Sequence, residues 1–89
     1  MIRSRDDEPA VRYFFHVRSE LELVRDVEGA EYATSDEARL EALAIARELI
    51  GRQLLRGGAV DWTTVVEIER EDGVTAVLVG FVEAAGLRA

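Results

Sequence analysis

The dipeptide Asp72-Gly73 lies between two runs of alternating apolar residues, and this arrangement constrains the fold more than any other feature. Asp-Gly is a favoured two-residue loop of β-hairpins because both positions accept a positive φ. With these residues as the loop, the predicted pairs are Ile68 with Val77, Val66 with Val79, and Thr64 with Phe81. A slip of one residue would turn every apolar side chain to the opposite face, so turn and pattern agree on one register.

A long amphipathic helix is expected before this hairpin. Thr34 and Glu37 have the spacing of a capping box, and Gly57-Gly58 supplies a residue able to adopt the left-handed conformation after the last turn. The predicted helix therefore runs from about Ser35 to Arg56. Its apolar face comprises Ala38, Ala42, Leu43, Ile45, Ala46, Leu49, Ile50 and Leu54. Gln53 falls within this face and needs a hydrogen-bond partner if it is buried.

The region before the helix has the pattern of another hairpin. Residues 11–18 alternate with a period of two and are rich in aromatic and β-branched side chains, which is typical of a strand. Residues 21–26 are expected to return beside them, but Ser19-Glu20 is a weak turn signal and leaves the register open. The predicted fold is α+β, in the order β-β-α-β-β, with a four-stranded antiparallel sheet and the helix packed on one face.

The chain of 89 residues is expected to form one domain over residues 11–84, with a polar N-terminal tail at 1–10 and a short C-terminal tail at 85–89. The first ten residues are rich in charge and do not resemble a signal peptide. The longest apolar run, Val74–Val82, is much shorter than the roughly 20 residues of a membrane-spanning helix. These features predict a cytoplasmic protein.

Composition excludes several kinds of chemistry. There is no cysteine, so disulfides and thiolate metal sites are impossible. All 11 cationic residues are arginines, which rules out a lysine nucleophile or a P-loop lysine. The formal net charge of −7 opposes binding to phosphate backbones and to anionic membranes, so nucleic acid is an unlikely partner and no membrane association is expected.

Candidate catalytic and metal-binding residues are few. His16 is the single histidine and lacks the companion ligands that a zinc site requires. The carboxylates of Asp26, Glu28 and Glu31 surround Gly29 without the spacing of a calcium loop, so we interpret them as a charged turn. No serine or threonine has the Gly-x-Ser-x-Gly setting of a nucleophile. We therefore expect no catalytic residue, no metal, no cofactor and no enzymatic activity.

The face of the sheet that points away from the helix, here called the second face, is the most informative surface. The last strand is apolar on both sides, whereas one helix covers only one side of a sheet. An exposed apolar surface of this kind marks an interface, so a homo-oligomer or a protein partner is expected. The predicted interface residues are Phe14, His16, Val65, Ala76, Leu78 and Val82.

The segment Arg12-Tyr13-Phe14-Phe15-His16-Val17-Arg18 resembles the opening of a family of short alphaproteobacterial, largely rhizobial, proteins classed as a domain of unknown function. The resemblance continues through Asp26, Gly29 and Glu31, then through the helix at residues 38–49, and ends with Asp72-Gly73 and Phe81. It covers about residues 11–82 and implies a small bacterial domain without an established activity. Ser19-Glu20 and Gly80 depart from the family pattern, which has Asp-Gly and often proline at these places.

Two functional hypotheses follow. The first is a non-catalytic protein-interaction module that self-associates through the second face. The alternative is a nucleic-acid-linked regulator of the antitoxin type, similar in layout to the HicB group, with Arg12, His16 and Arg18 as the residues facing the nucleic acid. Light scattering tests the first, and a salt-dependent binding assay tests the second.

Overall fold

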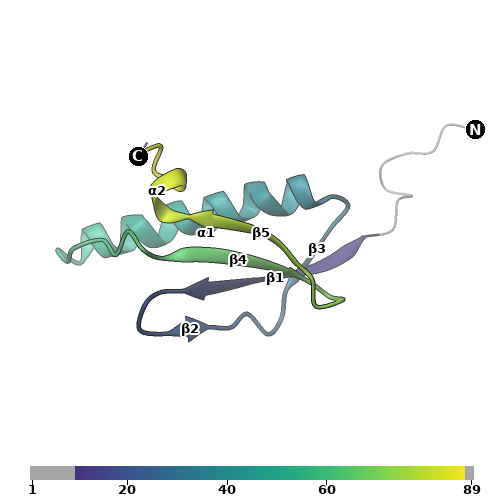
Figure 1. The fold of residues 1–89 in the computed structure, drawn as a ribbon. Coiled ribbons are helices and arrows are strands. Elements are labelled where there is room, and N and C mark those ends of the chain that lie inside the picture. The colour runs from purple at the N-terminus through teal and green to yellow at the C-terminus, as the bar shows by residue number, and fades with distance from the viewer. Residues whose placement is uncertain (1–9, 88–89) are drawn as a thin grey trace, which may run out of the picture.

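The computed structural model of the chain describes residues 10–87 and has the predicted α+β architecture (Figure 1). Within that range the elements are β1 (Val11–Arg18), β2 (Leu23–Val24), β3 (Ala30–Tyr32), α1 (Ser35–Leu55), β4 (Val65–Arg70), β5 (Thr75–Gly80) and α2 (Phe81–Ala84). Of the predicted N-terminal tail, residues 1–9 lie outside the described residues, as do residues 88–89 of the C-terminal tail.

The sheet is antiparallel and has the strand order β2-β1-β4-β5. β3, which the sequence did not predict, pairs with β1 as well: β2 lies beside Val17 and Arg18, and β3 lies beside Val11–Tyr13. β4 pairs with one edge of β1, and both β2 and β3 pair with the opposite edge. The five strands therefore fill four positions in the sheet. A strand of three residues is too short to show an alternating pattern.

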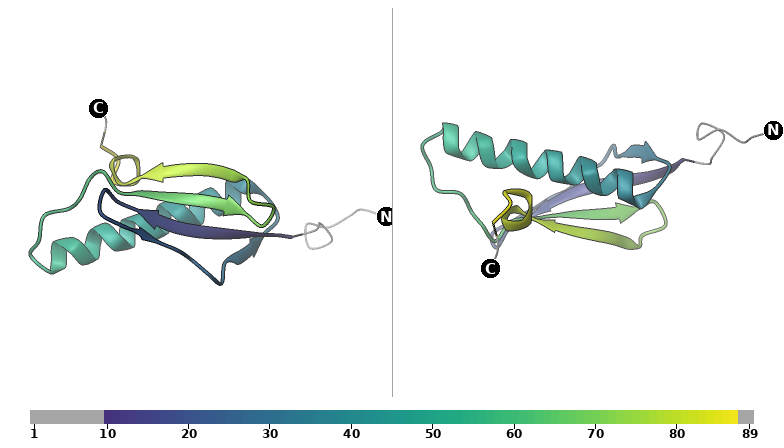
Figure 2. Two further views of the ribbon diagram at one scale, coloured as in Figure 1. Left: turned by 60° about the horizontal axis from the view of Figure 1, so that its bottom comes forward. Right: turned by 90° about the horizontal axis from the view of Figure 1, so that it is seen from above.

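The helix α1 begins and ends where its capping residues predict. Thr34 Oγ1 accepts a hydrogen bond from the N–H of Glu37, and Gly57 adopts a φ of +75° just beyond the last turn. Its buried residues are Ala38, Ala42, Ala46 and Ile50. The small alanine side chains bring the helix axis close to the sheet, and Figure 2 shows α1 lying across one face of it.

The C-terminal end of α1 projects past the ends of the strands (Figures 1 and 2). Leu54 was expected on the packed face but is exposed, because no strand lies beneath this part of the helix. Gln53, in contrast, has the partner that its position requires: its Oε1 accepts a hydrogen bond of 3.1 Å from the backbone N–H of Asp61.

The β4–β5 hairpin has the predicted register in its body, with Val66 opposite Val79 and Ile68 opposite Val77. The loop, however, contains three residues instead of two. The N–H of Gly73 donates to the carbonyl of Arg70, and the N–H of Arg70 donates to the carbonyl of Val74, each at 2.8 Å. A β-bulge compensates for the extra residue, since Glu69 pairs with Thr75 and leaves Ala76 without a partner.

The core lies between α1 and the covered face of the sheet. Its largest fully buried side chains are Phe81, Ile68, Val66 and Val79, of which Phe81 is the first residue of α2. Arg47 donates from Nε to the carbonyl of Ala84 at 2.9 Å, and Arg39 pairs with Glu83. These contacts hold α2 against α1 at the end of β5.

Candidate interaction surface

The second face is built from alternate residues of three strands. β1 contributes Phe14 and His16, which pair across the ladder with Glu69 and Glu67 of β4. β5 contributes Leu78, which pairs with Glu67. Because residues directly opposite in an antiparallel sheet share a face, these side chains lie on the side away from α1.

Ion pairs join β1 to neighbours on both of its edges on the second face, to β4 through Arg18–Glu67 and to β3 through Arg12–Glu31. Arg18 Nε contacts Glu67 Oε1, and Arg12 Nη2 contacts Glu31 Oε1 at 3.0 Å. The hydrogen bond and the charge of Glu67 raise the pKa of Arg18. Arg12 also donates to the carbonyl of Glu28 at 2.7 Å. Both arginines are therefore engaged within the chain, and this part of the face is polar instead of apolar.

His16 bridges three segments of the chain. Its Nδ1 accepts a hydrogen bond of 3.1 Å from the N–H of Asp26, and its Nε2 lies 2.7 Å from Glu69 Oε1. A ring nitrogen that accepts a hydrogen bond carries no proton, so in the neutral imidazole the proton is on Nε2 and is donated to Glu69. The ring of Phe14 stacks beside it, with the ring planes 2° apart. Both nitrogens are thus engaged, and the residue is only 6% exposed.

Asp26 organises the loop that leads from β2 to β3. Its Oδ1 accepts hydrogen bonds from the N–H groups of Glu28 and Gly29, and its Oδ2 accepts one from the N–H of Phe15, all at 3.1 Å. Partial burial acts to raise the pKa of the Asp26 carboxyl, but these bonds outweigh it and the pKa lies below the ordinary 3.8. The carboxylate is used by the backbone, which agrees with the interpretation of this segment as a charged turn.

Gly29 allows the loop to approach β1 closely. It has a φ of +68°, and a Cβ at this position would lie 2.7 Å from the carbonyl oxygen of Tyr13 and 3.0 Å from the ring of Phe14. Only glycine combines this conformation with this contact. The loop therefore covers part of Phe14, which leaves that side chain half-buried.

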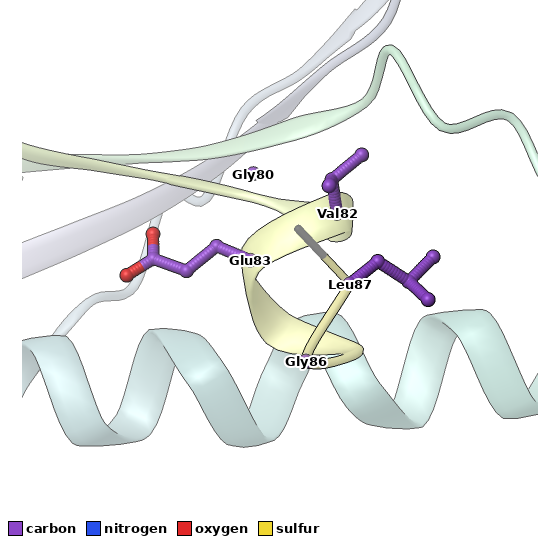
Figure 3. A pocket seen from close by; sticks show the side chains of 5 residues that line it. All are labelled: Gly80, Val82, Glu83, Gly86 and Leu87. Carbon is purple, nitrogen blue, oxygen red and sulfur yellow. The ribbon is translucent and has the colours of Figure 1, made fainter. Parts of the chain in front are cut away.

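The β5 end of the second face is apolar. Leu78 is 57% exposed, and Val65 and Val82 are half-buried. Val65 lies opposite Gly80, which has no side chain to cover it. An open hollow of about 550 Å³ extends from Gly80 along α2, lined by Gly80, Val82, Glu83, Gly86 and Leu87. In Figure 3, Val82 and Leu87 stand on one side of α2 and Glu83 on the other.

The predicted interface residues thus have different surroundings. Val65 and Leu78 are diagonal neighbours at the apolar end of the second face, and Val82 lines the hollow at Gly80. Phe14 is partly covered by the β2–β3 loop, and His16 is buried. Ala76 was expected beside Leu78 but packs against the core, because the bulge changes the alternation of side chains at this point. Gly80, which shapes the hollow, was not among the predicted residues, although a glycine inside an apolar strand is a signal of close approach.

Two other hollows lie among the described residues. One, of about 410 Å³, lies between α1 and the β1–β2 hairpin and includes Leu21, Val24 and Leu49. The other, of about 110 Å³, includes His16, Arg18, Glu67 and Glu69. In this second hollow both nitrogens of His16 already have partners, so the ring has no free nitrogen with which to accept a proton from a substrate.

Within residues 10–87, no three or more histidine, aspartate or glutamate side chains are placed to hold a metal ion together. No helix in this part of the chain has the length and apolar character needed to cross a membrane.

Comparison with known proteins identifies a family. The model of the domain of unknown function DUF6894 matches residues 12–80, which is most of the chain, and the chain belongs to this family. The match spans β1 to β5 and so includes the loop organised by Asp26 and the strands of the second face, but not Val82 in α2. Neither the curated proteins nor the solved structures contain a match.

Proposed function

We propose that this DUF6894 domain is a non-catalytic interaction module that self-associates through the apolar end of its second face. The observation that carries the proposal is the exposed Leu78, diagonal to Val65, on a face that α1 does not cover and next to the hollow at Gly80. An apolar side chain of this size gains about 1.5–3 kcal/mol when it is moved fully out of water. A second copy with the same surface supplies a matching apolar partner.

The charge distribution favours the same surface. The formal net charge of −7 makes two copies repel each other at long range. The segment Val74–Val82 contains no charged residue, and Glu83, which follows it, is paired with Arg39. Two copies can therefore meet along β5 without bringing unpaired carboxylates into contact.

The nucleic-acid alternative has less support in the structure. It relies on Arg12, His16 and Arg18, and each of these side chains contacts a glutamate of its own chain. Binding a phosphate would require each of them to exchange an existing partner. A protein contact at Leu78 requires no such exchange.

Sedimentation velocity and light scattering test the proposal. The weight-average mass is expected to rise from monomer toward dimer between about 1 µM and about 500 µM, the range of weak and transient complexes. Leu78→Glu should shift this rise to at least tenfold higher concentration, because it places a charge in the contact. Leu21→Glu is the matched control, since Leu21 is 96% exposed in the loop between β1 and β2, at the opposite edge of the sheet. A mass that stays monomeric throughout the range would contradict self-association.

A further inference from the structure

β5 is an edge strand with unpaired backbone groups. It stands at the end of the strand order, and no strand within residues 10–87 pairs with its outer side. The N–H of Phe81 donates to the carbonyl of Thr64, so this pair is a hydrogen-bonded one. Such pairs alternate along an antiparallel ladder, and the pairs Val65–Gly80 and Glu67–Leu78 are therefore not hydrogen-bonded. It follows that the N–H and C=O groups of Leu78 and the N–H of Gly80 point outward without a partner. The C=O of Gly80, the N-cap of α2, instead accepts the first hydrogen bond of that helix.

The outward side of β5 has few of the features that normally prevent edge pairing. Charged residues, proline and bulges usually protect an edge strand. Thr75–Gly80 contains neither a charged residue nor a proline. The bulge at Ala76 shortens the regular part of the edge to Val77–Gly80, which retains three outward groups without a partner, the N–H and C=O of Leu78 and the N–H of Gly80.

The same edge presents a projection and a hollow two residues apart. Leu78 stands out from the second face, 57% exposed. Gly80 carries no side chain, and the hollow that begins there is flanked by Val82 and Leu87 (Figure 3). A Cβ at Gly80 would meet only the side chain of Val65, at 3.8 Å. The space above Gly80 is therefore open to an apolar side chain from outside.

We propose that a second copy of this chain pairs antiparallel with the outer edge of β5, about a two-fold axis beside Val79, so that Leu78 of each copy fills the hollow at Gly80 of the other. This inference rests on the self-association proposed above and specifies its geometry. Leu78 of one copy lies opposite Gly80 of the second, and in each such pair the free N–H of Gly80 donates to the free C=O of Leu78. The two-fold axis generates both pairs, which makes two hydrogen bonds between free backbone groups and one continuous eight-position sheet.

This register joins the free N–H of Gly80 to the free C=O of Leu78 and avoids the irregular positions at both ends of β5. A shift of two residues toward the hairpin loop would place Gly80 opposite Ala76, where the bulge interrupts the ladder. A shift of two residues the other way would place Leu78 opposite Val82, which already belongs to α2. The pairing of Leu78 with Gly80 avoids both irregularities. It also places the largest exposed side chain of β5 opposite the one position without a side chain.

Disulfide trapping tests the register, and the cysteine-free chain gives a clean background. Residues directly opposite in a hydrogen-bonded pair have Cα atoms about 5.5 Å apart, within the range that a disulfide spans, whereas residues offset by two are about 7–8 Å apart. A mixture of Leu78→Cys and Gly80→Cys chains, one of them tagged, should form the mixed dimer under mild oxidation. Leu78→Cys alone should cross-link at least tenfold more slowly. Leu21→Cys mixed with Gly80→Cys is the control at the opposite edge.

Gly80→Pro tests the backbone hydrogen bonds without disturbing the monomer. Gly80 has a φ of −82° and a ψ of 154°, which proline adopts readily, and its N–H makes no bond within the sheet. The substitution removes both intermolecular hydrogen bonds that the N–H groups of Gly80 donate, and it fills part of the hollow. We expect the dimer dissociation constant to rise at least tenfold, while the midpoint of urea unfolding for the monomer stays the same or increases.

The outcomes separate this inference from the proposal on which it rests. The mixed disulfide together with a weakened Gly80→Pro dimer supports edge pairing. A dimer that resists Gly80→Pro and gives no mixed disulfide overturns edge pairing and leaves self-association intact. If this chain alone stays monomeric and β5 pairs only with a strand of a different protein, both the self-association and the pairing between two copies are overturned.

Discussion

The substitution Asp26→Asn tests whether one carboxylate holds the β2–β3 loop on the sheet. Asp26 uses both oxygens, Oδ1 for the N–H groups of Glu28 and Gly29 and Oδ2 for that of Phe15. Asparagine has nearly the same shape but one acceptor oxygen, so at least one of these N–H groups will face the amide nitrogen. An unsatisfied, partly buried donor costs about 1–3 kcal/mol, and the remaining bonds lose the strength that the charge provides. We expect a loss of about 2–3 kcal/mol at neutral pH.

The pH dependence of this loss provides a second measurement. The pKa of Asp26 in the folded chain lies below its ordinary value of 3.8, so the carboxylate stabilises the fold above that value. The contribution disappears as the pH falls below 3.8 and through the folded-state pKa. The difference in unfolding free energy between the native chain and Asp26→Asn should therefore stay constant from pH 7 to about pH 5 and shrink as the pH falls below 4.

Urea unfolding followed by the fluorescence of Trp62, the single tryptophan, measures both effects at protein concentrations low enough to keep the chain monomeric. Asp36→Asn is the control, because Asp36 is exposed in the first turn of α1. It should cost no more than about 0.5–1 kcal/mol. A native-like stability for Asp26→Asn, or a loss that persists unchanged at pH 3, would refute the role assigned to the carboxylate.

Three further predictions concern positions away from Asp26. Gly29→Ala should destabilise the fold by about 2–4 kcal/mol, since it combines a positive φ with a clash against Tyr13. Gly51→Ala should instead stabilise the fold by about 0.5–1 kcal/mol, because Gly51 lies inside α1 with open space around it. Thr34→Ala should lower the stability by about 1 kcal/mol through loss of the N-cap bond to Glu37, and Thr34→Ser should restore most of it; thermal unfolding measures both. Self-association should strengthen between about 20 mM and about 500 mM salt, because salt screens the repulsion between chains of net charge −7, and a dimer that weakens over this range would point to an ionic interface.

The parts of the fold that the sequence predicts are those with local causes. The bounds of α1 follow from Thr34 at its start and Gly57 at its end. Thr34 accepts a hydrogen bond from the N–H of Glu37, three residues later, and Gly57 adopts the positive φ just after the last turn. The body of the β4–β5 hairpin follows from the alternation of Val66 and Ile68 with the turn at Gly73. The loop length was wrong because a glycine with a φ of +88° fits a two-residue or a three-residue loop equally, and the bulge restores the register behind it.

The missed features depend on contacts between distant residues. β3 lies against β1 because Asp26 binds the N–H of Phe15, 11 residues earlier. The burial of His16 depends on Glu69, 53 positions along the chain. No alternation or capping pattern encodes such a pair. The outward positions of Val65 and Leu78 were predictable from alternation alone, but the exit of Ala76 from that face required knowledge of the bulge.

The arrangement of charge on the second face also decides between two modes of self-association. Stacking the second faces of two copies would bury the ion pair Arg18–Glu67, and removing such charges from water costs several kcal/mol per ion. Pairing along β5 leaves the Arg18–Glu67 ion pair in solvent and buries Leu78, whose diagonal neighbour on β4, Val65, is apolar. The ion pair thus acts against stacking, while the uncharged edge offers backbone groups that have no other partner. The polar side chains of β1 and β4 therefore favour contact between two copies along β5 over stacking of their second faces.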